Sequence, residues 1–349
     1  MIFDIAVNLA LATVDAAILF AISKRVRLVT TPRLIAVSVL VPVLLVPLLF
    51  LLGLFAFCRF MAWAIFVHLV ILLAGDAILN WKERRKMSIA SAAAALLIAG
   101  VGVDAFFIEP HWLEVTRHRI VSAKVKRPLK IAIIADYQTD AIGAYERQVL
   151  DLVKAENPDL VLFAGDYIQV HNDARRRELI RELRALLKEC GFKFAVAVEG
   201  NCDYDDWPEI FEGTGVEWTK ETREYRNGDV QITALSLMES EYEYASPEIG
   251  STERFHIVLG HIPNFALGNA QADLLVAGHT HGGQVRLPGM GPLITLSRIP
   301  RSWAAGVTQL TGDQTLIVSR GIGMERGRAP RLRFLCRPEL VIVDVVPAQ

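Results

Sequence analysis

The sequence has almost no excess charge of either sign. Its 37 Lys and Arg residues are balanced by 38 Asp and Glu residues, which leaves a formal net charge of −1. Binding to the phosphate backbone of a nucleic acid requires a concentrated surface of Lys and Arg, because much of the affinity comes from counterion release. The composition therefore gives no support for a nucleic-acid partner.

Cysteine is also scarce. The four cysteines, Cys58, Cys190, Cys202 and Cys336, form no CxxC pair and no zinc-ribbon spacing. Neither a disulfide scaffold nor a cysteine-based zinc site is expected. Cys58 and Cys190 lie in apolar or helix-like surroundings and are expected to be inert thiols.

Charge is nearly absent from four long apolar segments in the first part of the chain. A membrane-spanning helix requires roughly 20 mostly apolar residues, because the hydrocarbon core is about 30 Å thick and each helical residue rises about 1.5 Å. We therefore predict an all-α bundle of four transmembrane helices over residues 1–110, a basic linker over 111–128 and a second domain over 129–349. The alternative is a buried helical core. The segments run approximately from Phe3 to Ser23, Leu34 to Phe57, Met61 to Leu79 and Ser88 to Ile108.

The basic residues between these segments indicate how the chain crosses the membrane. Lys and Arg follow the first and third segments, so both loops are expected in the cytoplasm. An even number of crossings then predicts a multi-pass protein of a bacterial-type inner membrane with an extracytoplasmic second domain. Basic residues at 117–127 favour the opposite orientation, so a cytoplasmic domain stays open. Asp15 and Asp76, within the apolar segments, indicate either a helix–helix contact or a polar pathway.

From Lys130 onward one pattern recurs: a short apolar run of strand length that ends at a polar residue. Such continuous runs are typical of strands buried on both faces. Segments with helical spacing, around 145–156 and 173–189, separate the first three runs. This alternation predicts an α/β domain whose ligands bind at the carboxyl ends of adjacent strands. The runs are KIAIIAD, PDLVLFAGD, KFAVAVEGN, HIVLGH and DLLVAGH.

The residues at those ends all offer an oxygen or imidazole ligand. Burying six such side chains in one place is costly unless they bind metal. The mixture of donors favours Mn, Fe or Zn over Ca, and a carboxylate shared by two ions holds them about 3.5–4 Å apart. A glycine directly precedes four of them, which allows the backbone to turn sharply and approach an ion. The six residues are Asp136, Asp166, Asn201, His261, His279 and His281.

His279 and His281 are only two positions apart. In an extended segment their side chains would point in opposite directions. Either the loop turns between them, or each histidine serves a different metal ion.

In this order the motifs resemble those of the calcineurin-like metallophosphoesterases, which read DxH, GD, GN(H/x)D, GH and GHxH. The chain has DYQ at 136–138, GD at 165–166, GNCD at 200–203, GH at 260–261 and GHTH at 278–281. The similarity covers about Leu129 to Val345. The string GHTHGGQVRLPG and the SRGIG at 319–323 resemble the membrane-associated branch, which includes UDP-2,3-diacylglucosamine hydrolases of lipid A synthesis.

The resemblance implies a two-layer β-sandwich flanked by helices, with two divalent metal ions. By resemblance, Asp136, Asp166 and His281 would hold the first ion, and Asp166 would bridge to a second ion. The ligands of that second ion would also include Asn201, His261 and His279. The implied reaction is hydrolysis of a phosphoester or pyrophosphate by a water that the ions activate.

Two residues depart from the family pattern. Gln138 stands where the family usually has a metal-binding His, and an amide oxygen is a weaker ligand than imidazole. Cys202 and Asp203 are the predicted catalytic residues. By resemblance, Cys202 stands where the family has a His that protonates the leaving group, and a thiol with an ordinary pKa of about 8.5 is a poor substitute. Either the leaving group is a phosphate that departs without protonation, or the protein is a catalytically silent metal-binding membrane sensor or scaffold.

A tethered catalytic domain gains effective concentration for substrates held in the same membrane. We therefore expect a phosphorylated, lipid-linked substrate and contact with membrane lipids. Arg286 or Arg320 is expected near the substrate phosphate, because the guanidinium group suits phosphate geometry. A nucleotide-activated lipid would be met on the cytoplasmic side, which conflicts with the orientation predicted from the loops.

Overall fold

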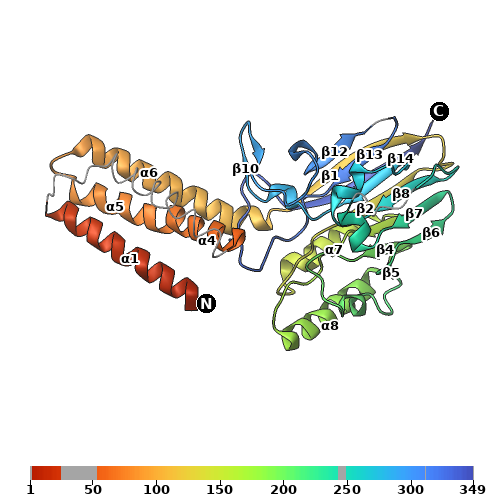
Figure 1. Ribbon diagram of the computed structural model, residues 1–349, viewed down its shortest axis with the longest axis horizontal. Coiled ribbons are helices and arrows are strands. Elements are labelled where there is room, and N and C mark those ends of the chain that lie inside the picture. The colour runs from red at the N-terminus through yellow and green to blue at the C-terminus, as the bar shows by residue number, and fades with distance from the viewer. Residues whose placement is uncertain (1, 25–52, 243–248, 311, 349) are drawn as a thin grey trace. The chain divides into compact units, whose positions relative to one another are not determined.

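The computed structural model describes residues 2–24, 53–242, 249–310 and 312–348. The chain divides into two compact units (Figure 1). The first consists of Met1–Phe107 together with Gly327–Arg331, and the second of Ile108–Arg326 with Leu332–Gln349.

The first unit is helical. Three of its helical segments, α4, η1 and α5, form one continuous helical run from Leu54 to Leu79, in which η1 is a π-helical turn. Leu69, Leu73 and Ala95 form a small core where α5 packs on α6. The described helices are α1 (Ile2–Ser23), α4 (Leu54–Trp63), η1 (Ala64–Leu69), α5 (Val70–Leu79), α6 (Arg85–Val103) and the π-helical η2 (Asp104–Ile108).

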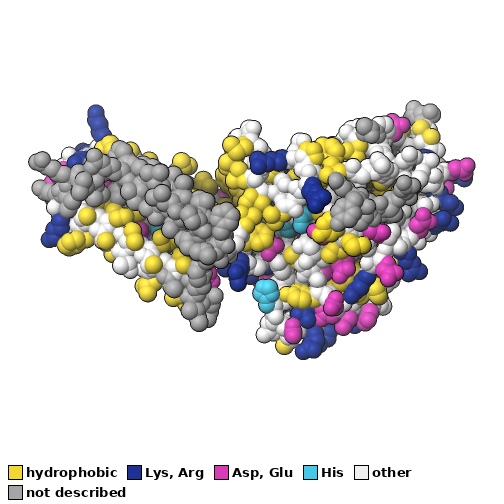
Figure 2. Space-filling model, in the orientation of Figure 1, with side chains coloured by type: hydrophobic (Ala, Val, Ile, Leu, Met, Phe, Trp, Pro, Cys, Tyr) yellow, Lys and Arg dark blue, Asp and Glu magenta, His cyan; other side chains and the backbone are white. Residues whose placement is uncertain are grey.

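Among the described residues, two helices are long and apolar enough to cross a membrane. They run over Leu54–Leu79 and Arg85–His111. In the 18-residue apolar stretch of each helix, only 33% and 22% of the residues are buried. Hydrophobic side chains accordingly cover much of the visible helical surface (Figure 2). The apolar part of α1 that could be tested, Val7–Ser23, is shorter. Most of the predicted span Leu34–Phe57 lies outside the described residues. The four-helix bundle is therefore not confirmed, and two apolar helices are weak evidence for membrane association.

Asp15 and Asp76, the two acidic residues singled out within the apolar segments, each make a contact between helices. Asp15 Oδ2 lies 2.6 Å from His68 Nδ1, and the other ring nitrogen of His68 lies 3.1 Å from Asn8 Oδ1. Asp76 accepts a hydrogen bond of 2.6 Å from the Ser91 hydroxyl. These contacts favour the helix–helix interpretation of both carboxylates.

The second unit is built on two six-stranded sheets (Figure 1). Strands β2, β3, β4 and β5 run parallel in the first sheet, and β7, β8, β9 and β13 run parallel in the second. The first sheet has the order β1 (Glu114–Ser122), β14 (Glu339–Pro347), β2 (Leu129–Ile134), β3 (Leu160–Phe163), β4 (Ala195–Val198), β5 (Glu217–Thr219). The second has the order β12 (Gly306–Gln309), β13 (Thr315–Val318), β9 (Leu274–Ala277), β8 (Phe255–Leu259), β7 (Val230–Ala234), β6 (Arg223–Asn227).

Alternating residues of the central strands serve two hydrophobic cores. Ile131 and Ile133 of β2 point between the sheets, where they join Ile257 of β8. Ala132 and Ile134 point the other way, into the core beneath two helices, α7 (Ala144–Glu156) and α8 (Asp173–Cys190). Because successive strand side chains face opposite sides, a strand between two cores must be apolar throughout. The predicted β-sandwich flanked by helices is confirmed.

The smaller elements of this unit lie in its loops. A short hairpin, β10 (Arg286–Leu287) with β11 (Gly291–Pro292), follows the predicted metal-binding loop. The remaining elements are one helix and five 3₁₀ turns: α9 (Leu237–Glu241), η3 (Glu109–His111), η4 (Trp207–Ile210), η5 (Pro263–Leu267), η6 (His281–Gly283) and η7 (Arg301–Trp303).

The structure differs from the sequence interpretation in two places. The expected linker over 111–128 contains β1, which pairs in parallel with β14 along all nine of its residues. β1 is an edge strand with alternating exposure, so charged residues are tolerated on it and hide its strand character. In addition, the five ligand-bearing strands are not neighbours in one sheet. β2, β3 and β4 belong to the first sheet, whereas β8 and β9 belong to the second.

Candidate metal centre

Loops from both sheets converge at the carboxyl ends of these strands. The backbone N–H of His279, after β9, donates to Asp136 Oδ1 after β2 over 2.9 Å. The backbone N–H of Cys202, after β4, donates to Asp166 Oδ1 after β3 over 2.7 Å. The two sheets therefore bring residues from four separate loops into one site.

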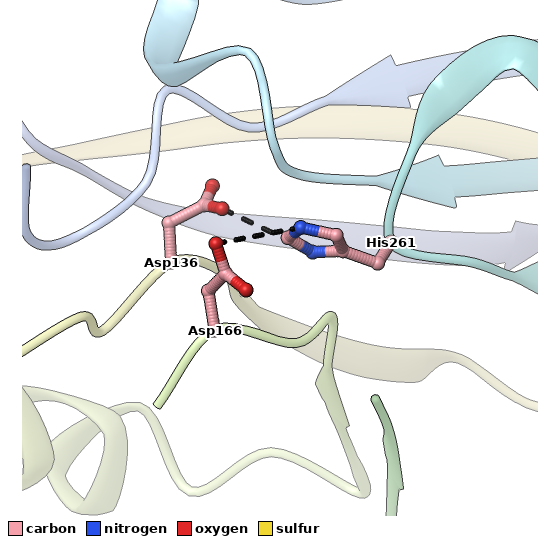
Figure 3. A group of neighbouring side chains, drawn as sticks. All are labelled: Asp136, Asp166 and His261. Atoms are coloured by element: carbon pink, nitrogen blue, oxygen red, sulfur yellow. Dashed lines mark ion pairs between the residues drawn. The ribbon is translucent and has the colours of Figure 1, made fainter. Parts of the chain in front are cut away.

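Asp136, Asp166 and His261 form the centre of the site (Figure 3). One ligand atom from each lies within 4.8 Å of those of the other two, and all three side chains are buried. His261 Nε2 is 3.5 Å from Asp166 Oδ2, and Nδ1 is 4.0 Å from Asp136 Oδ1. Two buried carboxylates this close repel each other, and a cation offsets that repulsion.

The pKa values of these groups reflect the repulsion. Burial and the charge of Asp166 raise the pKa of Asp136 to about 7. Burial alone would lower the pKa of His261, but the carboxylates of Asp166 and Asp136 raise it to about 9. Burial opposes ionisation of Asp166 as well, yet the charge of His261 and the N–H of Cys202 bring its pKa below the ordinary value. These opposing shifts show that the cluster carries closely spaced negative charge, which a cation would stabilise.

Hydrogen bonds fix which ring nitrogens face the site. His261 Nδ1 lies 2.7 Å from the Ala164 carbonyl oxygen, to which it donates, so Nε2 is directed to the centre. His279 Nε2 donates to the Leu296 carbonyl oxygen over 3.1 Å. Burial and His261 lower the pKa of His279 to about 4, so its ring is neutral. Nδ1 of His279 then has no proton, yet it lies 2.7 Å from Asn201 Oδ1, which is also an acceptor. A cation bound by both atoms would remove the repulsion between them.

His281 and Gln138 each present a buried atom to the same site. Among the described residues, His281 Nδ1 and Gln138 Oε1 have no hydrogen-bond partner. Unpaired buried polar atoms are rare and call for an explanation such as a bound ion. His279 and His281 both have positive φ, 70° and 49°, so the loop does turn between them. Together the donor set fits divalent cations that accept oxygen and imidazole ligands.

Backbone strain is concentrated at these residues. Asp136, Gln138 and Asp166 also adopt positive φ, at 49°, 39° and 58°. Non-glycine residues in this region are uncommon and persist where the surrounding structure enforces them, often at functional sites. The surrounding structure therefore fixes the backbone of the residues that carry the predicted ligands.

Asp203, predicted to be catalytic, has a different position. Its carboxylate accepts three backbone hydrogen bonds of 2.8–2.9 Å, from the N–H groups of Asp166, Tyr167 and Gly200. Both oxygens are thus engaged by the β3 and β4 loops. The structure favours a positioning role for Asp203 over a role in the reaction itself.

The predicted substrate residues are also partly engaged. Nη2 of Arg320 pairs with Glu114 over 2.8 Å and with Glu339 over 3.2 Å, and only 17% of its side chain is exposed. This pairing argues against Arg320 as the phosphate ligand. Arg286 lies in β10, is partly exposed and donates to the Gly282 carbonyl oxygen over 3.4 Å. Arg286 therefore stays the better candidate.

Two site residues were missed from the sequence. Gln169 and Glu325 surround Cys202: Nε2 of Gln169 lies 3.4 Å from Cys202 Sγ and donates to Glu325 Oε1 over 2.7 Å. A signal for Glu325 existed, because it follows the apolar run of β13 and the glycine-rich SRGIG. β13 is parallel to β9, so its carboxyl end lies at the same sheet edge as His279.

The environment of Cys202 opposes formation of a thiolate. Burial, followed by the charges of Asp166 and Glu325, raises the pKa of the thiol far above its usual range. A group that gives up its proton so reluctantly is a poor general acid near neutral pH.

Comparisons with known proteins agree with this site. A sequence model of the calcineurin-like phosphoesterase family matches residues 129–283. A metallophosphoesterase of Bacillus subtilis, YkuE, is 31% identical over 275 residues, which cover 72% of this chain and 92% of that protein. The phosphodiesterase YaeI of Escherichia coli is 27% identical over 76% of this chain and 99% of its own length.

Among solved structures, a dimetal phosphatase from Danio rerio is 13% identical and covers 58% of this chain and 90% of its own, with a TM-score of 0.35. The sequence relatives and the order of the motifs identify the family. The strand ends, the convergent carboxylates and imidazoles, and the relatives lead to one conclusion: the chain belongs to the calcineurin-like metallophosphoesterase family.

Proposed function

We propose that this chain is a membrane-anchored dinuclear-metal phosphoesterase that cleaves a phosphoester or pyrophosphate bond of a lipid-linked substrate, such as UDP-2,3-diacylglucosamine. The main support for hydrolase activity is the cluster of Asp136, Asp166 and His261, whose ligand atoms lie within 4.8 Å of one another. The two long apolar helices support the anchor. A membrane anchor favours a substrate that is held in the same bilayer.

The chain's own residues would divide the work of the site. Asp136, Gln138, Asp166 and His281 would hold one divalent ion, and Asp166 with Asn201, His261 and His279 a second. Bound there, Mn, Fe or Zn would supply an activated water and neutralise the charge that develops on the phosphoryl group. Asp203 keeps the β3 and β4 loops in register, and Arg286 is available to orient a substrate phosphate.

The leaving group follows from the chemistry of Cys202. Because a thiol stands at the position where the family has a histidine, this residue is a poor proton donor for the leaving group. Substrates whose leaving group is stable as an anion, such as a nucleoside monophosphate released from a pyrophosphate, lose little from a missing acid. This supports pyrophosphate cleavage over cleavage of an ester with an alkoxide leaving group.

The test uses full-length protein purified in detergent and loaded with Mn. Hydrolysis of bis-p-nitrophenyl phosphate and of a UDP-linked diacyl sugar is compared with that of Asp166→Ala and of Asp313→Ala, a control in an exposed turn. We expect turnover that only Asp166→Ala abolishes, and a preference for the lipid. Two bound Mn ions without turnover of any substrate would instead favour the silent sensor or scaffold.

A further inference from the structure

Besides Gln169, two further amide side chains approach the thiol of Cys202. Nε2 of Gln138 donates to Cys202 Sγ over 3.2 Å, and Nδ2 of Asn201 approaches the same sulphur at 3.5 Å. Both amides belong to residues that would hold metal. Each amide therefore turns its nitrogen toward the sulphur and its oxygen away from it.

The oxygen of Asn201 faces two of the predicted metal ligands. Asn201 Oδ1 lies 2.9 Å from His261 Nε2 and 2.7 Å from His279 Nδ1. Gln138 Oε1 is buried without a hydrogen-bond partner among the described residues, beside a nitrogen that lies 3.5 Å from Asp166 Oδ2. An orphaned oxygen so close to a predicted ligand is the kind of acceptor that a bound cation would satisfy.

Glu325 enforces the orientation of Gln138. Its Oε2 accepts from Gln138 Nε2 over 3.2 Å, and Asp166 Oδ2 lies 3.5 Å from the same nitrogen. If the amide were reversed, its oxygen would face the sulphur of Cys202 and two carboxylate oxygens. With both acids ionised and the S–H directed to Glu325, none of these three atoms could donate a hydrogen bond to that oxygen. The acceptors around Nε2 therefore leave one favourable orientation.

We propose that Cys202 and Glu325 are positioning residues that hold the amides of Gln138 and Asn201 with their oxygens toward the metal ions. The proposal rests on the two-metal site of the proposed function and explains both departures from the family pattern together. An amide ligand at position 138 must be oriented, and the thiol at position 202 accepts its N–H. Groups that orient metal ligands in this way typically contribute 10–100-fold to metal affinity.

Mn binding to metal-free, full-length protein in detergent tests the proposal, by calorimetry and by elemental analysis of bound Mn. We expect Cys202→Ala and Glu325→Ala each to weaken Mn binding about 10–100-fold. Cys202→Ser, whose hydroxyl oxygen also accepts hydrogen bonds, retains most of the affinity. Cys190→Ala and Glu253→Ala, a half-buried thiol and an exposed carboxylate outside the site, bind Mn like the unaltered protein.

A double variant, Gln138→His with Glu325→Ala, tests whether Glu325 acts by orienting the amide of Gln138. An imidazole ligand has no carbonyl oxygen to be oriented, so adding Gln138→His to Glu325→Ala should recover most of the lost affinity. A role of Glu325 in folding alone would not be rescued in this way, and melting curves in EDTA check that each variant folds.

Unchanged Mn affinity in folded Cys202→Ala and Glu325→Ala would overturn the proposal, as would failure of Gln138→His to rescue Glu325→Ala. A loss of rate confined to substrates with poor leaving groups, with Mn affinity intact, would overturn it as well and would make Cys202 the proton donor. The measurements of Mn affinity do not require turnover. A protein that binds Mn but hydrolyses nothing would refute the proposed function and still decide this inference.

Discussion

Asp203 holds Asp166 through the backbone: Oδ2 of Asp203 accepts the N–H of Asp166 over 2.9 Å. The same oxygen accepts the N–H of Gly200 over 2.8 Å. A single carboxylate therefore joins the loop that carries Asp166, the proposed bridging ligand, to the loop that carries the GNCD motif. The strained φ of Asp166, 58°, is maintained by this contact and by the N–H of Cys202 on its own carboxylate.

Asp203→Asn should disturb this junction. The new amide group must turn its NH2 toward at least one backbone N–H, and a buried donor left unpaired costs about 1–3 kcal/mol. We expect a lower free energy of unfolding by about that amount and weaker Mn-dependent hydrolysis. Urea denaturation and rate measurements check both effects against Asp205→Asn, a substitution of an exposed residue. Equal stability of the two variants would contradict the positioning role.

Gly200→Ala should displace the bridging carboxylate directly. A Cβ at this position would lie 2.2 Å from both the backbone nitrogen and Oδ1 of Asp166, too close for either to remain in place. Because a shift of about 1 Å in a reacting group can cost about 100-fold, we expect the hydrolysis rate to fall by at least that factor. Gly250→Ala is the matched control, since a Cβ there meets no atom within 4 Å. Similar rates for the two variants would show that the loop can adapt.

Arg333→Met should destabilise the second unit. The Arg333 side chain is fully buried and donates to the carbonyl oxygens of Cys336 over 2.9 Å and Arg320 over 2.8 Å, and also to Gly323. Methionine has a similar length but leaves these acceptors unpaired, at about 1–3 kcal/mol each. We expect a loss of several kcal/mol in thermal or urea unfolding. Arg181→Met, at an exposed position of α8 in the same unit, should change stability by less than about 0.5 kcal/mol.

Glu156→Gln tests whether β1 is part of the folded domain. Arg117 of β1 donates to Glu156 of α7 over 2.8 Å, and this hydrogen bond lowers the pKa of Glu156 below its ordinary value of 4.5. A lowered carboxyl pKa stabilises the fold above pH 4.5 and loses this effect as the pH falls further. We expect Glu156→Gln to cost up to about 1 kcal/mol at pH 7 and progressively less below pH 4.5. A pH-independent difference would indicate that the pair does not form.

Removal of metal should lower the thermal stability of the second unit. A ligand that binds only the folded state at 100 times its Kd stabilises it by about 2.7 kcal/mol. We therefore expect EDTA to lower the melting temperature and Mn to restore it, as followed by calorimetry. Asp166→Ala should show no response to Mn, whereas Asp313→Ala should respond fully. A Mn response that persists in Asp166→Ala would place the binding elsewhere on the protein.

The local sequence determined the strands and the polar residues that follow them at the candidate metal centre. Strands buried on both faces must be apolar at successive positions, so runs such as KIAIIAD could be recognised without a structure. The ligand residues Asp136, Asp166 and His261 follow such runs directly, because side chains at strand ends are the ones that reach a shared edge. β1 escaped recognition, since an edge strand keeps charged residues on its exposed face.

Only the tertiary structure decided which loops meet and what each polar group does. The strand runs do not encode their partners, so the division of the five ligand strands between two sheets required long-range packing. Glu325 and Cys202 are 123 positions apart and meet through the pairing of β13 with β9 and the packing of the two sheets. The ion pairs of Arg320 and the backbone contacts of Asp203 are likewise non-local. A side chain's role depends on its nearest partners in space, and the sequence specifies those only through the completed fold.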